Sequence, residues 1–398
     1  MLRCARIRRG PSVPATASAL RRKVKVKASP ARRNIFRDEW FLGVSLATVV
    51  IFFVFGDWFD GKLASPFWLA LVFIWLFGVV MGSALNVVRH ADHVSQVLGE
   101  PYGTLVLTLS VTAIEVLSIT AVMLHGENNP TLVRDTLFAI IMIILGGMVG
   151  VSLLAGGWRH REQHYNLQGA NAYLSVIIPL ALLTLSLPNF TVSTPGPTLS
   201  VPQQTFLVVI SLGLYIAFLA IQTGRHRGYF IMEDEAESEV TAGPEKAKGP
   251  LAKHAVLLIA YILPVVFLAE QLAHPIDYLI ETLKVPDPLG GVIIAMLVAT
   301  PEAIGATRAA LVNSVQRSVN IFLGSVLSTI GLTVPIMLVI SYFTAHEVNL
   351  GLVSANNLLL AITLGVSVVT FASGRTNILQ GAVHVVLFAA FLMLIFEV

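Results

Sequence analysis

Two apolar stretches that each carry a single acid decide the fold of this chain: TLSVTAIE at residues 108–115 and ATPE at residues 299–302. Each acid lies near the centre of a run that can cross a hydrocarbon core of ~30 Å as a helix. A charged side chain at that depth costs about 2.5–3.5 kcal/mol on insertion scales, so it normally pairs, takes up a proton or serves an ion path. Glu115 and Glu302 are therefore the candidate functional residues. The alternative is a pair of protonated glutamates that only joins helices.

The composition around these stretches is that of a membrane protein. Of the 398 residues, 55% are hydrophobic and 12% are charged, whereas a soluble domain carries about 25% charged residues. The long apolar runs predict eleven transmembrane helices, at residues 40–59, 67–88, 102–124, 136–156, 169–187, 203–222, 254–272, 289–311, 319–343, 353–372 and 377–396. The single cysteine, Cys4, excludes an internal disulfide and a thiolate metal cluster. No nucleotide-binding G-x-x-x-x-G-K-[ST] motif occurs.

The predicted fold is all-α and transmembrane, with one peripheral helix and two five-helix repeats of inverted topology. Five spans lie on each side of an acidic segment, and an odd number of spans makes the second repeat cross the membrane in the opposite sense. Weak internal similarity supports the repeat, because GANAYL at 169–174 parallels SANNLL at 354–359. The predicted divisions are a basic N-terminal tail (1–37), a first transmembrane helix (38–62), a first repeat (63–228), an acidic cytoplasmic linker (229–252) and a second repeat (253–398).

The distribution of basic residues predicts the orientation. With the N-terminus in the cytoplasm, the inside loops beyond the tail hold eleven Lys and Arg residues and the outside loops hold three, as the positive-inside rule requires. The tail carries twelve of the 26 Lys and Arg residues, which suits either a cytoplasmic tail beside anionic lipid or an organellar transit peptide. We therefore expect a bacterial cytoplasmic (inner) membrane, with an organellar membrane as the alternative.

The residues near the two glutamates offer only oxygen ligands. Pro301 cannot donate a backbone hydrogen bond and clashes with the carbonyl of Leu297, so a helix break at Pro301 would free a carbonyl oxygen at membrane depth. Four hydroxyl side chains are further candidate ligands: Thr112, Thr300, Ser325 and Ser328. Such a set suits hard cations such as calcium, which takes roughly 6–8 oxygen ligands. Burial also disfavours the charged form of a carboxyl group, so protons and a metal cation are expected to compete for one site.

Five polar side chains are candidates for an access path to this site: Asp92, Glu100, Asn171, Glu270 and Asn356. Solvation at the membrane surface is the alternative role for the acids, and cross-linking of helices is the alternative for the asparagines. His384 lies within the last predicted span. We expect it to be a packed, neutral imidazole rather than a proton carrier.

Several motifs resemble those of the calcium/cation antiporter superfamily, and most closely its ChaA-type bacterial calcium/proton exchanger branch. They are RHAD at 89–92, LGEPYGT at 98–104, ATPEA at 299–303, QRSVNIFLGS at 316–325 and TIGLTVP at 329–335. The resemblance covers about residues 35–398. It implies an eleven-helix antiporter in which Glu115 and Glu302 bind the cation and hydroxyl and carbonyl oxygens complete the shell. Many relatives carry Asn where this chain has Gly146-Gly147 and Ser325, so sodium or potassium exchange stays open.

The expected function is secondary antiport of calcium against protons, with sodium or potassium also open as the cation. The alternatives are a sodium(potassium)/proton antiporter with little calcium transport, a passive cation channel, a membrane-embedded hydrolase and a structural scaffold. Neither H-E-x-x-H nor G-x-S-x-G occurs, which argues against a hydrolase. We expect no enzymatic activity, no cofactor and no nucleic-acid partner. The expected partners are the lipid bilayer and the transported cations, and the sequence does not predict an oligomeric state.

Overall fold

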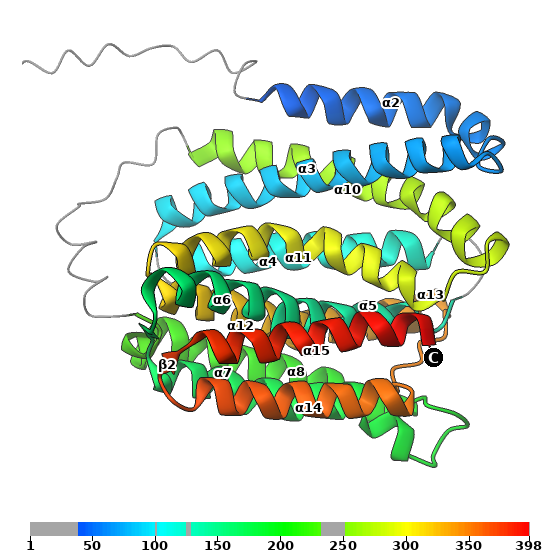
Figure 1. Ribbon diagram of the computed structural model, residues 1–398. Coiled ribbons are helices and arrows are strands. Elements are labelled where there is room, and N and C mark those ends of the chain that lie inside the picture. The colour runs from blue at the N-terminus through cyan, green and yellow to red at the C-terminus, as the bar shows by residue number, and fades with distance from the viewer. Residues whose placement is uncertain (1–38, 100–101, 125–128, 232–250, 398) are drawn as a thin grey trace, which may run out of the picture. The chain divides into compact units, whose positions relative to one another are not determined.

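The computed structural model describes residues 39–99, 102–124, 129–231 and 251–397. Over these ranges, eleven helices are long and apolar enough to cross a membrane, which confirms the predicted number of spans (Figure 1). The helices belong to one unit, Phe41–Val398. The predicted basic tail and most of the predicted acidic linker lie outside the described residues.

Six spans precede the linker and five follow it. The first six are α2 (Trp40–Asp60), α3 (Pro66–Leu98), α4 (Tyr102–Met123), a fourth span made of α5 (Leu132–Ile141), η1 (Met142–Met148) and α6 (Val149–His160), then α7 (Leu167–Leu185) and α8 (Val201–Ala220) with its extension η3 (Ile221–Arg225). The other five are α10 (Leu251–Asp277) with η5 (Tyr278–Thr282), α11 (Pro288–Leu311), a ninth span made of α12 (Val315–Ser328), η6 (Thr329–Thr333) and α13 (Val334–Thr344), then α14 (Ser354–Phe371) and α15 (Ile378–Glu397).

The loops contain little regular structure in the described ranges. Two short 3-10 turns, η2 (Leu187–Phe190) and η4 (Arg227–Phe230), follow α7 and η3. The strands β1 (Gln163–His164) and β2 (Arg375–Thr376) pair antiparallel, which joins the loop after the fourth span to the loop before the last span.

Local sequence sets several helix starts. Proline lies in the first turn of α3 (Pro66) and of α11 (Pro288), where a helix needs no backbone donor. Ser200 and Gln203 form a capping box at the start of α8. The Asn166 side chain accepts a backbone hydrogen bond at the start of α7. These caps satisfy donors that would otherwise be unpaired where the chain enters the membrane.

The fourth and ninth spans form the centre of the bundle. In their most apolar windows 78% and 72% of the residues are buried, against 17% in α2. Each of the two spans is interrupted near its middle by a π segment, η1 or η6. The predicted peripheral position of the first helix agrees with the low burial of α2.

Buried apolar side chains form two clusters, and the glutamate helices contribute to both. One cluster, named here the α3–α10 cluster, joins α2, α3 and α10 with residues of α4 and α11 such as Ile114 and Leu297. The other, named here the main cluster, joins spans 4–6 and 8–11 and includes Val116 of α4. α4 and α11 both contact α3. They therefore lie at the boundary between the two clusters, as Figure 1 shows.

Polar contacts fasten the α3–α10 cluster. His90 of α3 and His254 of α10 are buried, and their Nδ1 atoms are 3.0 Å apart. Toward the opposite end of α10, Nδ1 of His274 lies 2.9 Å from Oδ2 of Asp60 in α2. The cluster is thus held by polar contacts as well as by apolar packing.

Helix contacts repeat between the two halves. α5 packs on α11, and the corresponding element α12 contacts α4. α6 packs on α15, as α13 packs on α8. α7 contacts α8, as α14 contacts α15. The fold is therefore one peripheral helix plus two five-helix repeats, as predicted.

The structure corrects two details of the sequence analysis. α3 continues to Leu98, well past its predicted end at residue 88. Pro301 does not break its helix, because α11 runs without interruption from Pro288 to Leu311. A proline still leaves the carbonyl four residues earlier without its usual donor. The interruptions fall instead in the fourth and ninth spans, at η1 and η6.

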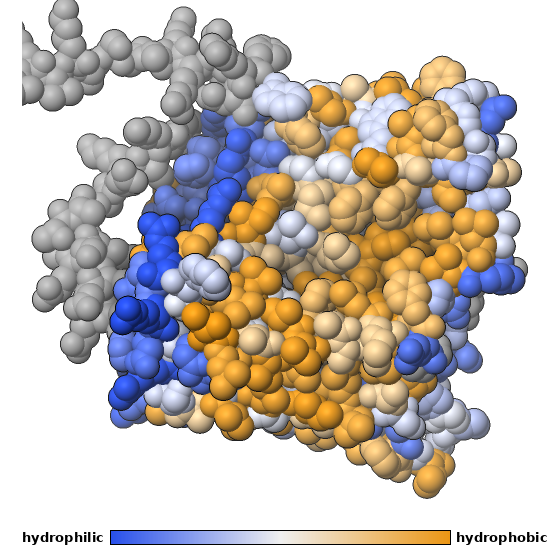
Figure 2. Space-filling view, viewed as in Figure 1, coloured by the Kyte–Doolittle hydropathy of each residue, from blue (hydrophilic) through white to orange (hydrophobic). Residues whose placement is uncertain are grey.

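The surface of the bundle has the polarity that a bilayer requires. Figure 2 shows a broad apolar band across the helices, with hydrophilic side chains at both ends. Exposed apolar side chains contribute to this surface along the outer helices, such as Phe53 of α2, Phe206 of α8 and Val386 of α15. Only lipid makes so large an exposed apolar area favourable. The chain is an integral, multi-pass membrane protein.

Candidate cation and proton site

Glu115 is held inside the bundle by α4. Its side chain is 2% exposed, and α4 contacts α3, α10, α11 and η6. The hydroxyl of Thr329 donates a hydrogen bond to Oε2 of Glu115 at 3.1 Å. The other carboxyl oxygen, Oε1, is buried without a hydrogen-bond partner. This oxygen is therefore available to a proton or a ligand.

The π segment η6 brings two threonines to Glu115. Thr329 begins η6 and Thr333 ends it, and both side chains are buried. Thr333 also lies beside the Glu115 carboxyl group, although its hydroxyl makes no hydrogen bond of good geometry. π segments are rare and occur often at functional sites. Here the segment lines one side of a buried acid.

Glu302 lies on α11, which contacts α4. Both carboxyl oxygens of Glu302 are buried, and neither has a hydrogen-bond partner. The carboxyl groups of Glu115 and Glu302 are close enough to interact electrostatically. The structure thus places both predicted glutamates on neighbouring helices, with the carboxyl oxygens of Glu302 and Oε1 of Glu115 buried inside the protein.

A cluster of unpaired oxygens surrounds the two glutamates. On α4, α11 and η6 the buried oxygens without a hydrogen-bond partner are Oγ1 of Thr112, Oε1 of Glu115, Oγ of Ser118, both carboxyl oxygens of Glu302 and Oγ1 of Thr333. Burying such groups unpaired is unfavourable, so the cluster needs water, protons or a cation. Carboxyl and hydroxyl oxygens are the ligands that hard cations prefer.

The predicted hydroxyl ligands are used in different ways. Thr112 is buried one turn before Glu115 and its hydroxyl is unpaired. Thr300 donates instead to the Met296 carbonyl of its own helix, at 2.5 Å. Ser328 likewise donates to the carbonyl of Ser325, at 2.9 Å, and Ser325 itself is half-buried. Thr300 and Ser328 are therefore engaged within their own helices.

Of the predicted access residues that lie in the described ranges, none forms a hydrogen bond with either glutamate. Asp92 accepts a hydrogen bond from Gln96 near the end of α3, at 2.9 Å. Glu270 is exposed on α10, Asn171 is exposed near the start of α7, and Asn356 is half-buried near the start of α14. Glu100 lies outside the described residues. A role of these five residues in ion access stays a prediction.

Sequence reasoning does not single out Thr329 and Thr333, although the structure places both beside Glu115. The available signal is the run TIGLT at 329–333, in which the two threonines are four residues apart. In the sequence, Ser325 and Ser328 are equally suitable as hydroxyl ligands near the glutamates. The hydroxyls that face the acid lie in the π segment η6, and the sequence does not indicate where that segment forms.

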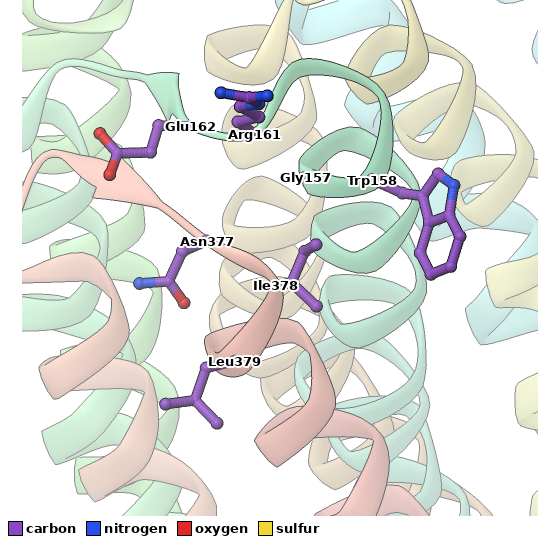
Figure 3. A pocket seen from close by; sticks show the side chains of 7 residues that line it. All are labelled: Gly157, Trp158, Arg161, Glu162, Asn377, Ile378 and Leu379. Carbon is purple, nitrogen blue, oxygen red and sulfur yellow. The ribbon is translucent and has the colours of Figure 1, made fainter.

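A surface pocket lies at one end of the fourth span, beside the start of α15 (Figure 3). It is lined by Gly157, Trp158, Arg161, Glu162, Asn377, Ile378 and Leu379. Trp158 points away from the other labelled side chains (Figure 3). This open pocket has one acid and is separate from the glutamates. Over the described ranges, no group of three or more His, Cys, Asp and Glu side chains could hold a metal ion.

Eleven spans with two buried acids at their centre define the class of protein as a multi-pass membrane protein. The profile of the sodium/calcium exchanger protein family matches residues 68–224 and 253–397, which covers the two repeats separately. The chain belongs to the sodium/calcium exchanger family. The resemblance of its motifs to the calcium/cation antiporter superfamily is thereby confirmed.

Two named antiporters are similar to this chain in sequence. The sodium-potassium/proton antiporter ChaA of Escherichia coli (strain K12) is 40% identical over 352 residues, covering 87% of this chain and 93% of the relative. The Ca(2+)/H(+) antiporter ChaA of Bacillus subtilis (strain 168) is 24% identical over 219 residues, covering 53% of this chain and 62% of the relative. Both relatives are named as antiporters that move protons.

Solved structures share the fold. Native YfkE superposes with a TM-score of 0.69 at 19% identity, covering 90% of this chain and 100% of that structure. The H+/Ca2+ exchanger CAX gives a TM-score of 0.64 at 12% identity, covering 90% of this chain and 89% of that structure. At these identities the likeness establishes the architecture alone.

Proposed function

We propose that this protein is a secondary antiporter that exchanges a metal cation for protons, with Glu115 and Glu302 as the shared binding groups. One observation carries the proposal: three of the four oxygens of the two carboxyl groups are buried without a hydrogen-bond partner, and only Oε2 of Glu115 has one. Two carboxylates enclosed in this way need a cation to balance their charge, and otherwise they take up protons. The site therefore holds either a cation or protons.

Exchange follows if the site faces one side of the membrane at a time. α4 and α11 lie between the α3–α10 cluster and the main cluster. Movement of one cluster against the other would expose the glutamates to each side in turn. With the N-terminus in the cytoplasm of a bacterial cell, the cation leaves as protons enter.

Calcium is the first candidate for the cation. The charge of two carboxylates matches one divalent cation, and hydroxyl oxygens such as that of Thr112 complete an all-oxygen shell. Sodium or potassium is the second candidate. It is supported by the relative at 40% identity, which is named a sodium-potassium/proton antiporter.

Calcium-driven proton movement across proteoliposomes tests the proposal. Wild-type protein should move protons against calcium, and Glu115→Gln and Glu302→Gln should each abolish exchange while the variant still inserts, because each removes one of the two charges. Glu347→Gln, at an exposed loop acid, should behave as wild type and is the matched control. Normal exchange in either of the first two variants would refute the site. Cation flux without proton countermovement would indicate a channel.

A further inference from the structure

His384 of α15 is fully buried and uses both ring nitrogens. Nδ1 lies 2.6 Å from the carbonyl oxygen of Leu145, and Nε2 lies 2.9 Å from Oγ1 of Thr370. A carbonyl oxygen only accepts, so Nδ1 must carry the hydrogen. In the neutral ring Nε2 then accepts from the hydroxyl of Thr370. The hydrogen bonds thus favour one tautomer and require no charge.

Leu145 lies in the π segment η1, and its carbonyl has lost its usual donor. In an α-helix the N–H of Val149 would donate to Leu145, four residues earlier. Here that N–H donates to the carbonyls of Ile144 and Gly146 instead. A carbonyl without a donor at membrane depth is unfavourable. The Nδ1–H group of His384 donates to the Leu145 carbonyl, which Val149 does not reach in η1.

Two contacts show which residues of α11 and of the fourth span lie at the same height along the helix axes. Gly291 packs so closely on Thr136 that a methyl group there would lie 2.7 Å from the Thr136 backbone nitrogen. Further along, Oγ1 of Thr307 lies 3.2 Å from Oγ of Ser152. The contacts are sixteen residues apart on each span, from 291 to 307 and from 136 to 152. The two spans therefore run in parallel and in register.

This register places Glu302 level with Gly147. Glu302 follows the first contact by eleven residues on α11, and Gly147 follows it by eleven on the fourth span. Leu145, whose carbonyl His384 binds, therefore lies two residues before the position on the fourth span that is level with Glu302. On its other side the glycine pair packs on α15, since a methyl group at Gly146 would lie 3.2 Å from the backbone nitrogen of Phe388.

We propose that His384 is a positioning residue for the cation and proton site, because its Nδ1–H group caps Leu145 and so holds η1 in place beside Glu302. This inference rests on the proposed exchange function. Without the cap, η1 would gain by reverting to regular α-helix, which would rotate Gly146 and Gly147 relative to α11. His384 acts through η1 and exchanges no proton itself.

Two substitutions separate this role from proton transfer and from packing. In His384→Asn the amide nitrogen is bonded to Cγ, as Nδ1 is in histidine, so the donor is kept while the titratable ring is lost. His384→Leu keeps a buried side chain of similar bulk and removes the donor. Apparent cation affinity, maximal rate and the pH profile of exchange are measured in proteoliposomes, with melting temperature in detergent as a readout that needs no transport.

The Asn variant should keep the affinity and the pH profile of wild type. The Leu variant should weaken apparent cation affinity about tenfold, as expected when a buried carbonyl loses its partner, and should melt at a lower temperature. Wild-type affinity in the Leu variant overturns the proposal. An Asn variant that loses cation affinity or shifts its pH profile also overturns the proposal. The Asn variant therefore tests the proposal even if the Leu variant fails to insert. If wild-type protein exchanges no cation, the proposed function fails, while the melting temperatures still test the cap.

Discussion

The two glutamates have different neighbours. Glu115 accepts a hydrogen bond from Thr329 and has Thr333 beside it. Glu302 has no hydrogen-bond partner for either carboxyl oxygen. Of the two acids in the described ranges, only Glu115 accepts a hydrogen bond from a hydroxyl of a facing span. We expect Glu115 and its threonines to form most of the ligand shell and Glu302 to supply the second charge.

Removing the Thr329 hydroxyl tests this unequal shell. Thr329→Val should weaken apparent cation affinity about tenfold or more, because a hydrogen bond to a charged group contributes about 1.5–3 kcal/mol. Thr329→Ser keeps the hydroxyl and should stay close to wild type. Affinity is read as the half-saturating cation concentration of exchange.

Thr205→Val is the matched control for this series. Thr205 is exposed on α8 and its hydroxyl donates to the Val201 carbonyl of the same helix at 2.8 Å. The control should leave cation affinity unchanged. Equal affinities of Thr329→Val and wild type would show that the hydroxyl does not serve the site.

Between helices, glycine permits the closest approach. Gly150 of the fourth span faces α15, where a methyl group would lie 2.8 Å from the backbone nitrogen of Val385. A methyl group at Gly381 of α15 would in turn lie 2.7 Å from the backbone nitrogen of Leu154. Small residues at such contacts let backbones pack closely in lipid, where packing rather than the hydrophobic effect drives helix association. The fourth span and α15 therefore form a tightly packed pair.

A single methyl group should disturb this pair. Gly150→Ala is expected to destabilise the protein by about 1–3 kcal/mol, because an overpacked contact with backbone atoms forces the helices apart. Gly365→Ala on α14 has no atom within 4 Å of the added carbon and should be neutral or slightly stabilising. Thermal unfolding in detergent measures both. Equal melting temperatures would contradict the packing described here.

The positions of the helices could be predicted from the sequence, and the irregularities within them could not. Lipid requires long apolar runs, so the limits of a span such as α11 are visible as hydropathy. The π segments η1 and η6 leave no mark in the hydropathy, and on our proposal η1 is held by a tertiary contact, that of His384 with Leu145. Hydropathy shows which residues lie within a span, so Glu115 and Glu302 could be identified as buried acids. It does not show side-chain orientation, so the hydrogen bond of Thr300 to its own helix could not be predicted.

Across all eleven helices, the glutamates lie where the α3–α10 cluster meets the main cluster. α3 and α10 are equivalent helices of the two repeats and pack on each other. The fourth and ninth spans are likewise equivalent and are the most deeply buried. The proposed exchange needs movement at the binding site, and we expect this movement at the boundary between the clusters.

The proposed orientation of these helices can be tested with cysteine labelling. Ser193 lies between α7 and α8, Ser373 lies between α14 and α15, and both are exposed. In a Cys4→Ser background, which removes the single cysteine, a membrane-impermeant maleimide added to intact cells should label Ser193→Cys. It should label Ser373→Cys only after permeabilisation. The reverse pattern would place the N-terminus outside.

The most direct measurement is proton release on cation binding to the purified protein in weakly buffered detergent solution. Calcium should release about one to two protons per bound ion, because ligand groups must lose their protons to bind a metal, and apparent affinity should fall as the pH is lowered. Sodium, potassium and magnesium, tested in parallel, identify the preferred cation. Glu115→Gln and Glu302→Gln should each reduce the release. Binding of any of these cations to wild-type protein without proton release would contradict the shared site.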